Sequence, residues 1–97
     1  MTGASSYRVI WTVNALAALK SIRDTFRESG KLINLGPILR AMDERLRTDP
    51  VGFGEIYRSA NAIEEHLAVV RPLAIDFAVD KARKVVLVRK SHALALD

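Results

Sequence analysis

Residues 73–88 read LAIDFAVDKARKVVLV, and this stretch decides the fold. In its first half, leucine, isoleucine, phenylalanine and valine alternate with two alanines and two aspartates, so one face is apolar and the other is small and acidic. Strict alternation predicts a half-buried strand over 73–80. The polar turn at 80–83 and the apolar run after it predict a second strand over Val85–Arg89, which returns antiparallel to the first.

Upstream of this hairpin, the sequence predicts two helices that share one apolar template, with apolar residues at i, i+3, i+4, i+7 and i+11. The first helix follows Thr12 or Asn14, since either side chain can cap it, and runs to about Glu28, where Gly30 ends it. Its apolar stripe consists of Ala15, Ala18, Leu19, Ile22 and Phe26.

The second helix follows Asn34, which is its expected cap, and stops at residues 49–50, an Asp-Pro pair. Pro37 is tolerated because it falls in the first turn, where its missing N–H is not needed. Asp43 and Arg47 stand four residues apart on the exposed face and can pair. The apolar stripe repeats the template with Leu35, Ile38, Leu39, Met42 and Leu46.

Three further segments complete the pattern. Residues 7–11 have period two and predict an opening strand, and Glu55–Ala60 predicts another strand after the helices. Residues 61–66 are expected to form a polar connection of uncertain form. Pro72 marks either the start of the next strand or a break in a longer strand that begins at Leu67.

This order of elements predicts an α+β fold with the sequence β-α-α-β-β-β. An N-terminal strand and an antiparallel helical hairpin are expected, with the hairpin packed on one face of an antiparallel sheet of four or so strands. The order excludes the alternating βαβ scheme of nucleotide-binding folds. With 97 residues, the chain is expected to form a single domain over 1–97, in which residues 1–6 are a loose tail.

Composition narrows the class of protein. The absence of cysteine excludes disulfides and thiolate metal sites and predicts a reducing, cytoplasmic location. The sequence shows neither the pattern of a signal peptide nor an apolar run long enough for a membrane helix, so no membrane partner is expected. Lys and Arg exceed Asp and Glu by 15 to 11, which permits contact with nucleic acid or an acidic protein, although many small domains carry as much.

Motifs for conventional catalysis are absent from the sequence. It contains neither a GxxxxGK[ST] nor a GxGxxG phosphate loop, and it has no GxSxG elbow. His66 and His92 are far apart in the chain, and neither has a histidine four residues away, so a zinc site is not expected. We therefore predict neither a cofactor nor a metal.

Basic residues in the strand half are the remaining candidates for chemistry. They can hold an RNA backbone and stabilise the charge of a phosphoryl transition state; alternatively, they are edge charges that prevent strands of different molecules from pairing. Tyr57 and Phe53 either stack on bases or belong to the core. Asp76 either anchors an arginine across the sheet (Arg58 or Arg89) or acts as a general base. The basic set comprises Arg58, Arg71, Arg83, Lys84, Arg89, Lys90 and His92.

Taken in order, these segments resemble the RelE/ParE superfamily of toxins from bacterial type II toxin–antitoxin systems. The resemblance implies a helical hairpin packed on a curved antiparallel sheet, and a cognate antitoxin as protein partner, with an extended or helical segment lying along the toxin. It covers almost the whole chain and rests on YRVIW (7–11), NAL (14–16), RTDP (47–50), GEIYR (54–58), RPLAIDFAVD (71–80) and VVLVRKSH (85–92).

The resemblance also implies candidate site residues. RelE-like members cleave messenger RNA in the ribosome with basic residues and often a tyrosine near the carboxyl terminus, whereas ParE-like members inhibit DNA gyrase. Arg58 matches a basic position on the family's second strand, and His92 matches a histidine common after the last strand. With Arg71 and Arg89, they form the candidate catalytic set. The chain departs from the RelE-like pattern at Ala74, where many relatives have arginine, and it lacks the tyrosine.

Four interpretations therefore remain open. The first two are a toxin that cleaves messenger RNA on the ribosome and a toxin that inhibits DNA gyrase. The third is a non-catalytic or degenerate toxin-like protein that binds only a protein partner. The fourth is a small basic RNA-binding module.

Overall fold

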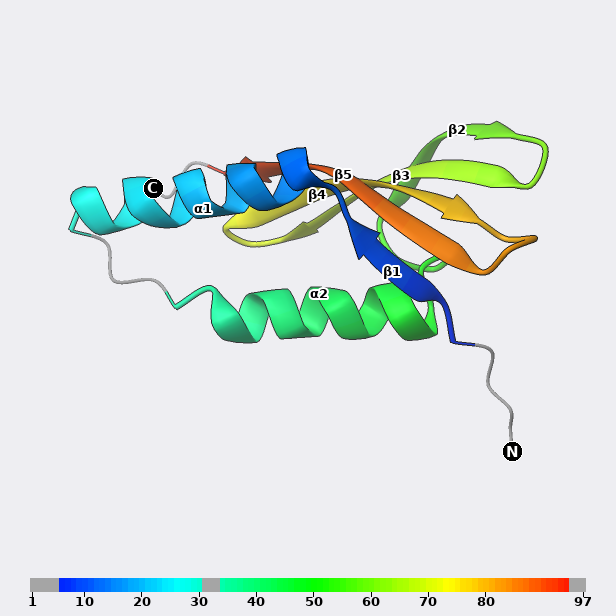
Figure 1. Cartoon of the computed structure of the whole chain (residues 1–97), viewed down its shortest axis with the longest axis horizontal. Helices are drawn as coiled ribbons and strands as arrows, with labels where there is room; N and C mark the ends of the chain where they lie inside the picture. The colour runs from blue at the N-terminus through cyan, green and yellow to red at the C-terminus, as the bar shows by residue number, and fades with distance from the viewer. Residues whose placement is uncertain (1–5, 31–33, 95–97) are drawn as a thin grey trace.

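The computed structural model describes residues 6–30 and 34–94 (Figure 1). Of the expected loose tail over 1–6, all but Ser6 lies outside the described residues. Two helices and five strands follow in the order β1 (Arg8–Trp11), α1 (Val13–Glu28), α2 (Gly36–Thr48), β2 (Glu55–Ala60), β3 (Ile63–Val70), β4 (Leu73–Asp80) and β5 (Val85–Ala93).

The five strands form one sheet in the order β1-β5-β4-β3-β2. Strands β2 to β5 are an antiparallel meander, as predicted, but β1 runs parallel to β5, with Arg8 opposite Val85 and Trp11 opposite Val88. The predicted α+β fold, with two helices packed on one sheet, is confirmed. The sheet itself is mixed and has five strands, where about four antiparallel strands were expected. Alternation along a strand defines its two faces but not the direction of a neighbour distant in the sequence.

Strand β3 is the additional strand that the sequence analysis did not predict in full. Its first half was expected to be a polar connection, because Glu64 and His66 occupy positions that point toward the core. The structure satisfies both side chains internally. His66 is fully buried, with Nε2 3.0 Å from Glu64 Oε1 and Nδ1 3.1 Å from the carbonyl oxygen of Phe53. Lys81 Nζ donates to Glu64 Oε2 at 2.8 Å.

The helix boundaries largely follow the sequence signals. Thr12 is the cap of α1, because its Oγ1 accepts a hydrogen bond from the Ala15 amide at 3.1 Å, while Asn14 lies inside the helix. Gly30 follows α1 with φ of 75°, a conformation that favours glycine. The expected cap of α2 is corrected: Leu35 occupies the N-cap position, while Asn34, one residue earlier, accepts a hydrogen bond from the Gly36 amide at 3.0 Å. The predicted pair forms, with Arg47 Nε 2.7 Å from Asp43 Oδ2.

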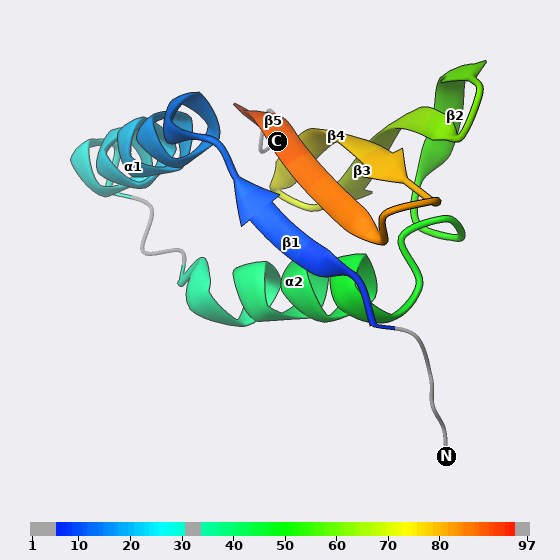
Figure 2. The ribbon, with the colours of Figure 1, turned by 45° about the vertical axis from the view of Figure 1, so that its right-hand side comes forward.

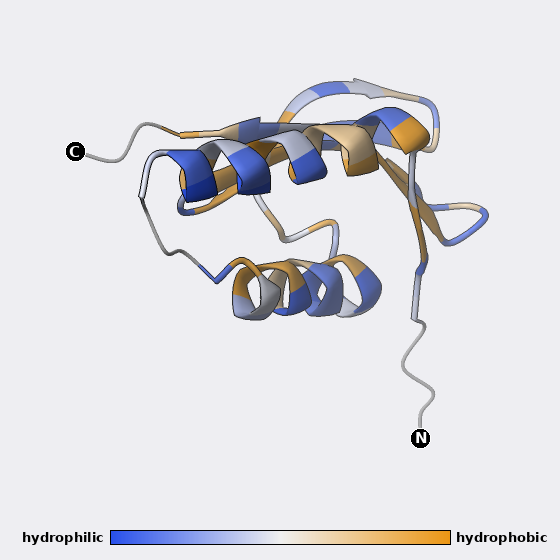
Figure 3. Ribbon diagram, turned by 60° about the vertical axis from the view of Figure 1, so that its left-hand side comes forward, coloured by the Kyte–Doolittle hydropathy of each residue, from blue (hydrophilic) through white to orange (hydrophobic). Residues whose placement is uncertain are grey.

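Both helices pack on the same face of the sheet, and the hydropathy colouring shows the apolar side of α2 turned toward the strands (Figures 2 and 3). On this face the helices pack against every second side chain of the strands. The opposite face of the sheet carries neither α1 nor α2. The buried cluster contains Ala15, Phe26, Leu35, Met42, Leu46, Phe53, Ala68, Leu73, Ile75, Phe77, Val79, Val86 and Val88.

Candidate functional site

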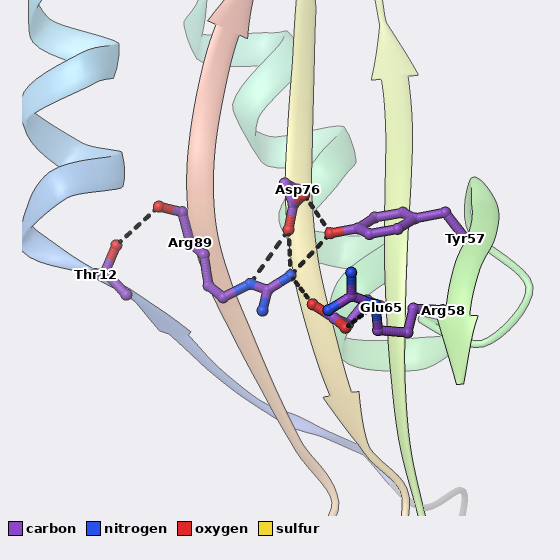
Figure 4. Close-up of polar contacts among 6 residues, drawn as sticks. All are labelled: Thr12, Tyr57, Arg58, Glu65, Asp76 and Arg89. Carbon is purple, nitrogen blue, oxygen red and sulfur yellow. Dashed lines mark hydrogen bonds and ion pairs between the residues drawn. The ribbon is translucent and has the colours of Figure 1, made fainter. Parts of the chain in front are cut away.

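The helix-free face of the sheet, called the open face below, carries a connected group of polar side chains (Figure 4). Arg89 reaches from β5 across β4, and its Nη2 lies 2.6 Å from Asp76 Oδ1, 2.7 Å from Glu65 Oε1 and 2.9 Å from the Tyr57 hydroxyl. Tyr57 donates to Asp76 Oδ2 at 2.5 Å. Arg58 Nε lies 3.4 Å from Glu65 Oε2. We call these five residues the Arg89 network.

Two β-bulges orient the side chains of Tyr57 and Arg89 within the network. In β2 the pairing steps from Ile56 to Arg58, so Tyr57 is the extra residue, and the pairing of β5 skips Arg89 in the same way. A bulge leaves one residue unpaired and redirects its side chain. Thr12 fixes the second bulge from the side of α1, because its amide donates to the Val88 carbonyl at 3.0 Å and its hydroxyl to the Arg89 carbonyl at 3.4 Å.

The charges within the Arg89 network balance, since two guanidinium groups face two carboxylates. Burial disfavours ionisation of Asp76, but hydrogen bonds from Tyr57 and Arg89 outweigh it and lower the pKa of Asp76. The same bond to Asp76 raises the pKa of Tyr57 above its usual value of 10.0. Burial opposes the charge of Arg89, yet its bonds to Asp76 and Glu65 raise its pKa further.

These directions limit the chemistry of the network. A carboxylate with a lowered pKa is a weak base, and a phenol with a raised pKa stays protonated near neutral pH. Neither Asp76 nor Tyr57 is therefore prepared to accept a proton from a substrate. Of the two roles considered for Asp76, the anchoring of Arg89 is confirmed.

The four candidate residues from the sequence do not meet at one point. Arg58 and Arg89 converge on Glu65, whereas His92 is exposed and lies opposite Ala74 on β4. Arg71 lies in the turn between β3 and β4. Within residues 6–30 and 34–94, neither the side chain of His92 nor that of Arg71 makes a hydrogen bond or an ion pair.

His92 and Arg58 lie far apart along the strand direction of the sheet. Arg58 lies opposite Glu65, which in turn lies opposite Ala78, whereas His92 lies opposite Ala74. Four residues of strand span about 13 Å. The structure therefore brings two of the four candidates together and leaves His92, the one histidine among them, outside the network.

Glu65 and Tyr57 are the residues that the sequence analysis missed. Glu65 was placed in the polar connection, and Tyr57 was expected either in the core or against a base. The side chain of Tyr57 is 50% exposed and belongs to the network, whereas Phe53 is in the core, with its ring stacked on Phe77 at 5.8 Å between centroids. One feature of the sequence could have identified Glu65. A hairpin centred on the turn before Leu73 places Glu65 opposite Ala78, on the open face.

A second feature is an apolar groove between α1 and α2. One part has a volume of about 580 Å³ and an apolar floor, and it continues into a part of about 700 Å³ that shares Leu16, Leu19 and Leu39. Leu16 is 51% exposed and lines both parts of the groove. The remaining lining residues are Trp11, Arg40, Asp43, Glu44, Arg47 and Thr48 in the first part, and Lys20, Arg23, Arg27, Asn34, Leu35 and Gly36 in the second.

The described part of the chain offers no evident place for a metal ion, since it contains no group of three or more His, Asp or Glu side chains suited to bind one. None of its helices is both long and apolar enough to cross a membrane.

The sequence matches no protein-family model and no curated protein. Two solved structures are similar over nearly the full length of both chains. One is the archaeal RelE–RelB complex from Pyrococcus horikoshii OT3, with a TM-score of 0.64 and 16% identity over 94% of this chain and 98% of that chain. The other is the toxin–antitoxin complex RelBE2 from Mycobacterium tuberculosis, with a TM-score of 0.62 and 17% identity over 97% and 98%. The chain therefore has the fold of the RelE toxins in these complexes.

Proposed function

We propose that this chain is the toxin of a type II toxin–antitoxin pair, which arrests growth when free and is neutralised by a cognate antitoxin. One observation carries the proposal: the fold agrees with RelE chains from two toxin–antitoxin complexes over almost the whole length of each chain. An open sheet face and an apolar groove on the helical side give such a protein two separate surfaces, one for a target and one for a partner.

The groove between α1 and α2 is our proposed antitoxin site. At one end its rim carries Lys20, Arg23 and Arg27, of which Arg23 pairs with its neighbour Asp24, and at the other end Arg47 is paired with Asp43. An amphipathic helix places apolar residues every three to four positions, which suits a groove floored by leucines, and acidic residues beside them match the basic rim. We therefore propose that the antitoxin contributes an acidic amphipathic helix.

For the mode of action, we propose binding to a protein target such as DNA gyrase. The guanidinium groups of Arg58 and Arg89 are neutralised by Glu65 and Asp76, which weakens their attraction for RNA phosphates. Leu67 and Val69 lie on the same open face with 43% and 50% exposure. A charge-balanced surface with exposed apolar side chains is more typical of protein recognition than of RNA binding.

Cleavage of messenger RNA is the second candidate. Two observations support it. The imidazole of His92 and the guanidinium of Arg71 are both exposed toward the same end of the sheet, and neither is paired with a side chain in the part of the chain that the structure describes. An imidazole can transfer protons near neutral pH, and a guanidinium can stabilise the charge of a phosphoryl transition state. In this mode Arg58, Arg71 and Arg89 would bind phosphate while His92 exchanged protons.

Expression of the chain in a bacterium tests the toxin assignment. We expect induction of the chain alone to arrest growth, and co-expression of the antitoxin from the adjacent reading frame to restore it. Replacing Leu16 and Leu19 by serine should weaken antitoxin binding and leave arrest intact. Unimpaired growth while folded protein accumulates would refute the assignment and favour a housekeeping RNA-binding module, whose affinity for RNA would fall steeply with salt.

Purified components distinguish the two modes of action. We expect the protein to block DNA supercoiling by gyrase and to leave ribosome-bound message intact. Message cleavage that disappears in His92→Ala, with unchanged thermal unfolding, would instead establish the nuclease.

A further inference from the structure

One carboxylate, that of Glu65, lies between two guanidinium groups on the open face (Figure 4). Its Oε1 is 2.7 Å from Arg89 Nη2, and its Oε2 is 3.4 Å from Arg58 Nε. The side chain of Glu65 is only 17% exposed, whereas those of Arg58 and Arg89 are 72% and 33% exposed. Solvent therefore reaches both cations from the open side, while the anion fills the space between them.

Without Glu65, the two guanidinium groups of Arg58 and Arg89 would face a single carboxylate, that of Asp76. Asp76 would still hold Arg89 through its 2.6 Å contact, but Arg58 would have no acid partner among the described residues. Two guanidinium groups that converge on one point form a binding site for an oxyanion. A phosphate group has more acceptor oxygens than a carboxylate and carries up to twice the charge, so it fits two guanidinium groups better than the single carboxylate they now share.

We propose that Glu65 is a built-in counter-ion that occupies a phosphate-binding site formed by Arg58 and Arg89. The wild-type chain binds phosphate groups weakly because the ligand must displace this carboxylate. The site is a property of the purified chain, and it exists whether or not the chain arrests growth. The same counter-ion also weakens the attraction of both arginines for the phosphates of RNA.

Substitution of the counter-ion tests this directly. We expect Glu65→Gln to bind inorganic phosphate at least tenfold more tightly than wild type, measured by NMR titration of the arginine Nε resonances at constant ionic strength. Glu55→Gln is the matched control, because Glu55 is exposed on the neighbouring strand β2 and makes no ion pair with any described residue. It removes the same charge and should leave phosphate affinity within twofold of wild type.

Two further variants make the outcome decisive. Adding Arg58→Gln to Glu65→Gln should abolish the gain, because only one guanidinium group then remains. Glu65→Asp keeps the charge but shortens the reach, so it should give an intermediate affinity, and it replaces Glu65→Gln if that variant does not fold. An affinity of the folded Glu65 variant no higher than that of the Glu55 variant would overturn the proposal, as would a gain that persists without Arg58. Equal binding of acetate would instead identify a site for carboxylates of an acidic protein and overturn the phosphate assignment.

Discussion

Strand β3 separates two polar clusters that differ in their contact with water. Glu64 and His66 point toward the helices and share a buried hydrogen bond, and Lys81 donates to Glu64 from the protein surface. Glu65 points to the open face and joins the Arg89 network. His66 is fully buried, while Arg89 keeps a third of its side chain exposed. Adjacent residues on one strand therefore serve different purposes: the inner cluster stabilises the fold, and the outer cluster sets the charge of a surface.

Within the inner cluster, the carboxylate of Glu64 is charged. Hydrogen bonds from Lys81 and His66 lower the pKa of Glu64, so this side chain is ionised and can only accept. The carbonyl oxygen of Phe53 is also only an acceptor, and it lies 3.1 Å from the other ring nitrogen of His66. The ring of His66 therefore links a carboxylate to a backbone carbonyl group inside the core.

The largest expected effect follows from breaking the inner cluster. His66→Ala leaves the carboxylate of Glu64 and the carbonyl of Phe53 without the ring that lies between them, and it opens a cavity beside Phe77, whose ring stacks on His66 at 5.0 Å. We expect the free energy of unfolding to fall by about 3–5 kcal/mol in chemical denaturation. The exposed His92 provides the control, and His92→Ala should change stability by no more than about 0.5 kcal/mol. Equal effects of the two substitutions would contradict the distinction between the clusters.

Breaking the outer cluster should matter less. Asp76→Asn keeps the size of the side chain but removes the charge that holds Arg89 and one acceptor for Tyr57. Water can reach these partners, so we expect a loss of about 1–2 kcal/mol in the free energy of unfolding. A loss as large as that of His66→Ala would show that the open face is as important to the fold as the core. Asp24→Asn serves as control, because among the described residues Asp24 pairs only with its exposed neighbour Arg23.

The predictability of the two clusters from sequence differs for a physical reason. Strand β4, both helices and the Asp43–Arg47 pair follow local rules of periodicity, capping and spacing, and the structure confirms them. These rules fail for the inner cluster. Because the polar residues Glu64 and His66 occupy core positions of β3, the strand does not show the usual alternation of apolar and polar residues. The outer cluster depends on two bulges, whose extra residues, Tyr57 and Arg89, appear only once the pairing of distant strands is known. The parallel placement of β1 beside β5 has the same origin.

The contribution of Asp76 should also depend on pH. Its folded pKa lies below the ordinary value of 3.8, so the stability that it contributes is present above that value and is lost as the pH falls through the folded pKa. We expect the difference in unfolding free energy between wild type and Asp76→Asn to be constant near neutral pH and to shrink below about pH 4. Denaturation curves across this range measure it. A difference that does not change in acid would mean that the charge of Asp76 plays no part.

The smallest expected effect concerns the proton of Tyr57. The chain has two tyrosines, so the variant Tyr7→Phe leaves Tyr57 as the only phenol that titrates in ultraviolet absorbance. Because its hydroxyl donates to Asp76, its pKa should exceed the ordinary 10.0, and adding Asp76→Asn should lower it. A folded pKa above the unfolded one means that this contribution to stability is present below pH 10 and is lost as the pH rises through the folded value. An unchanged titration in the double variant would show that in solution the hydroxyl contacts water instead of Asp76, and the outer cluster would then reduce to its ion pairs.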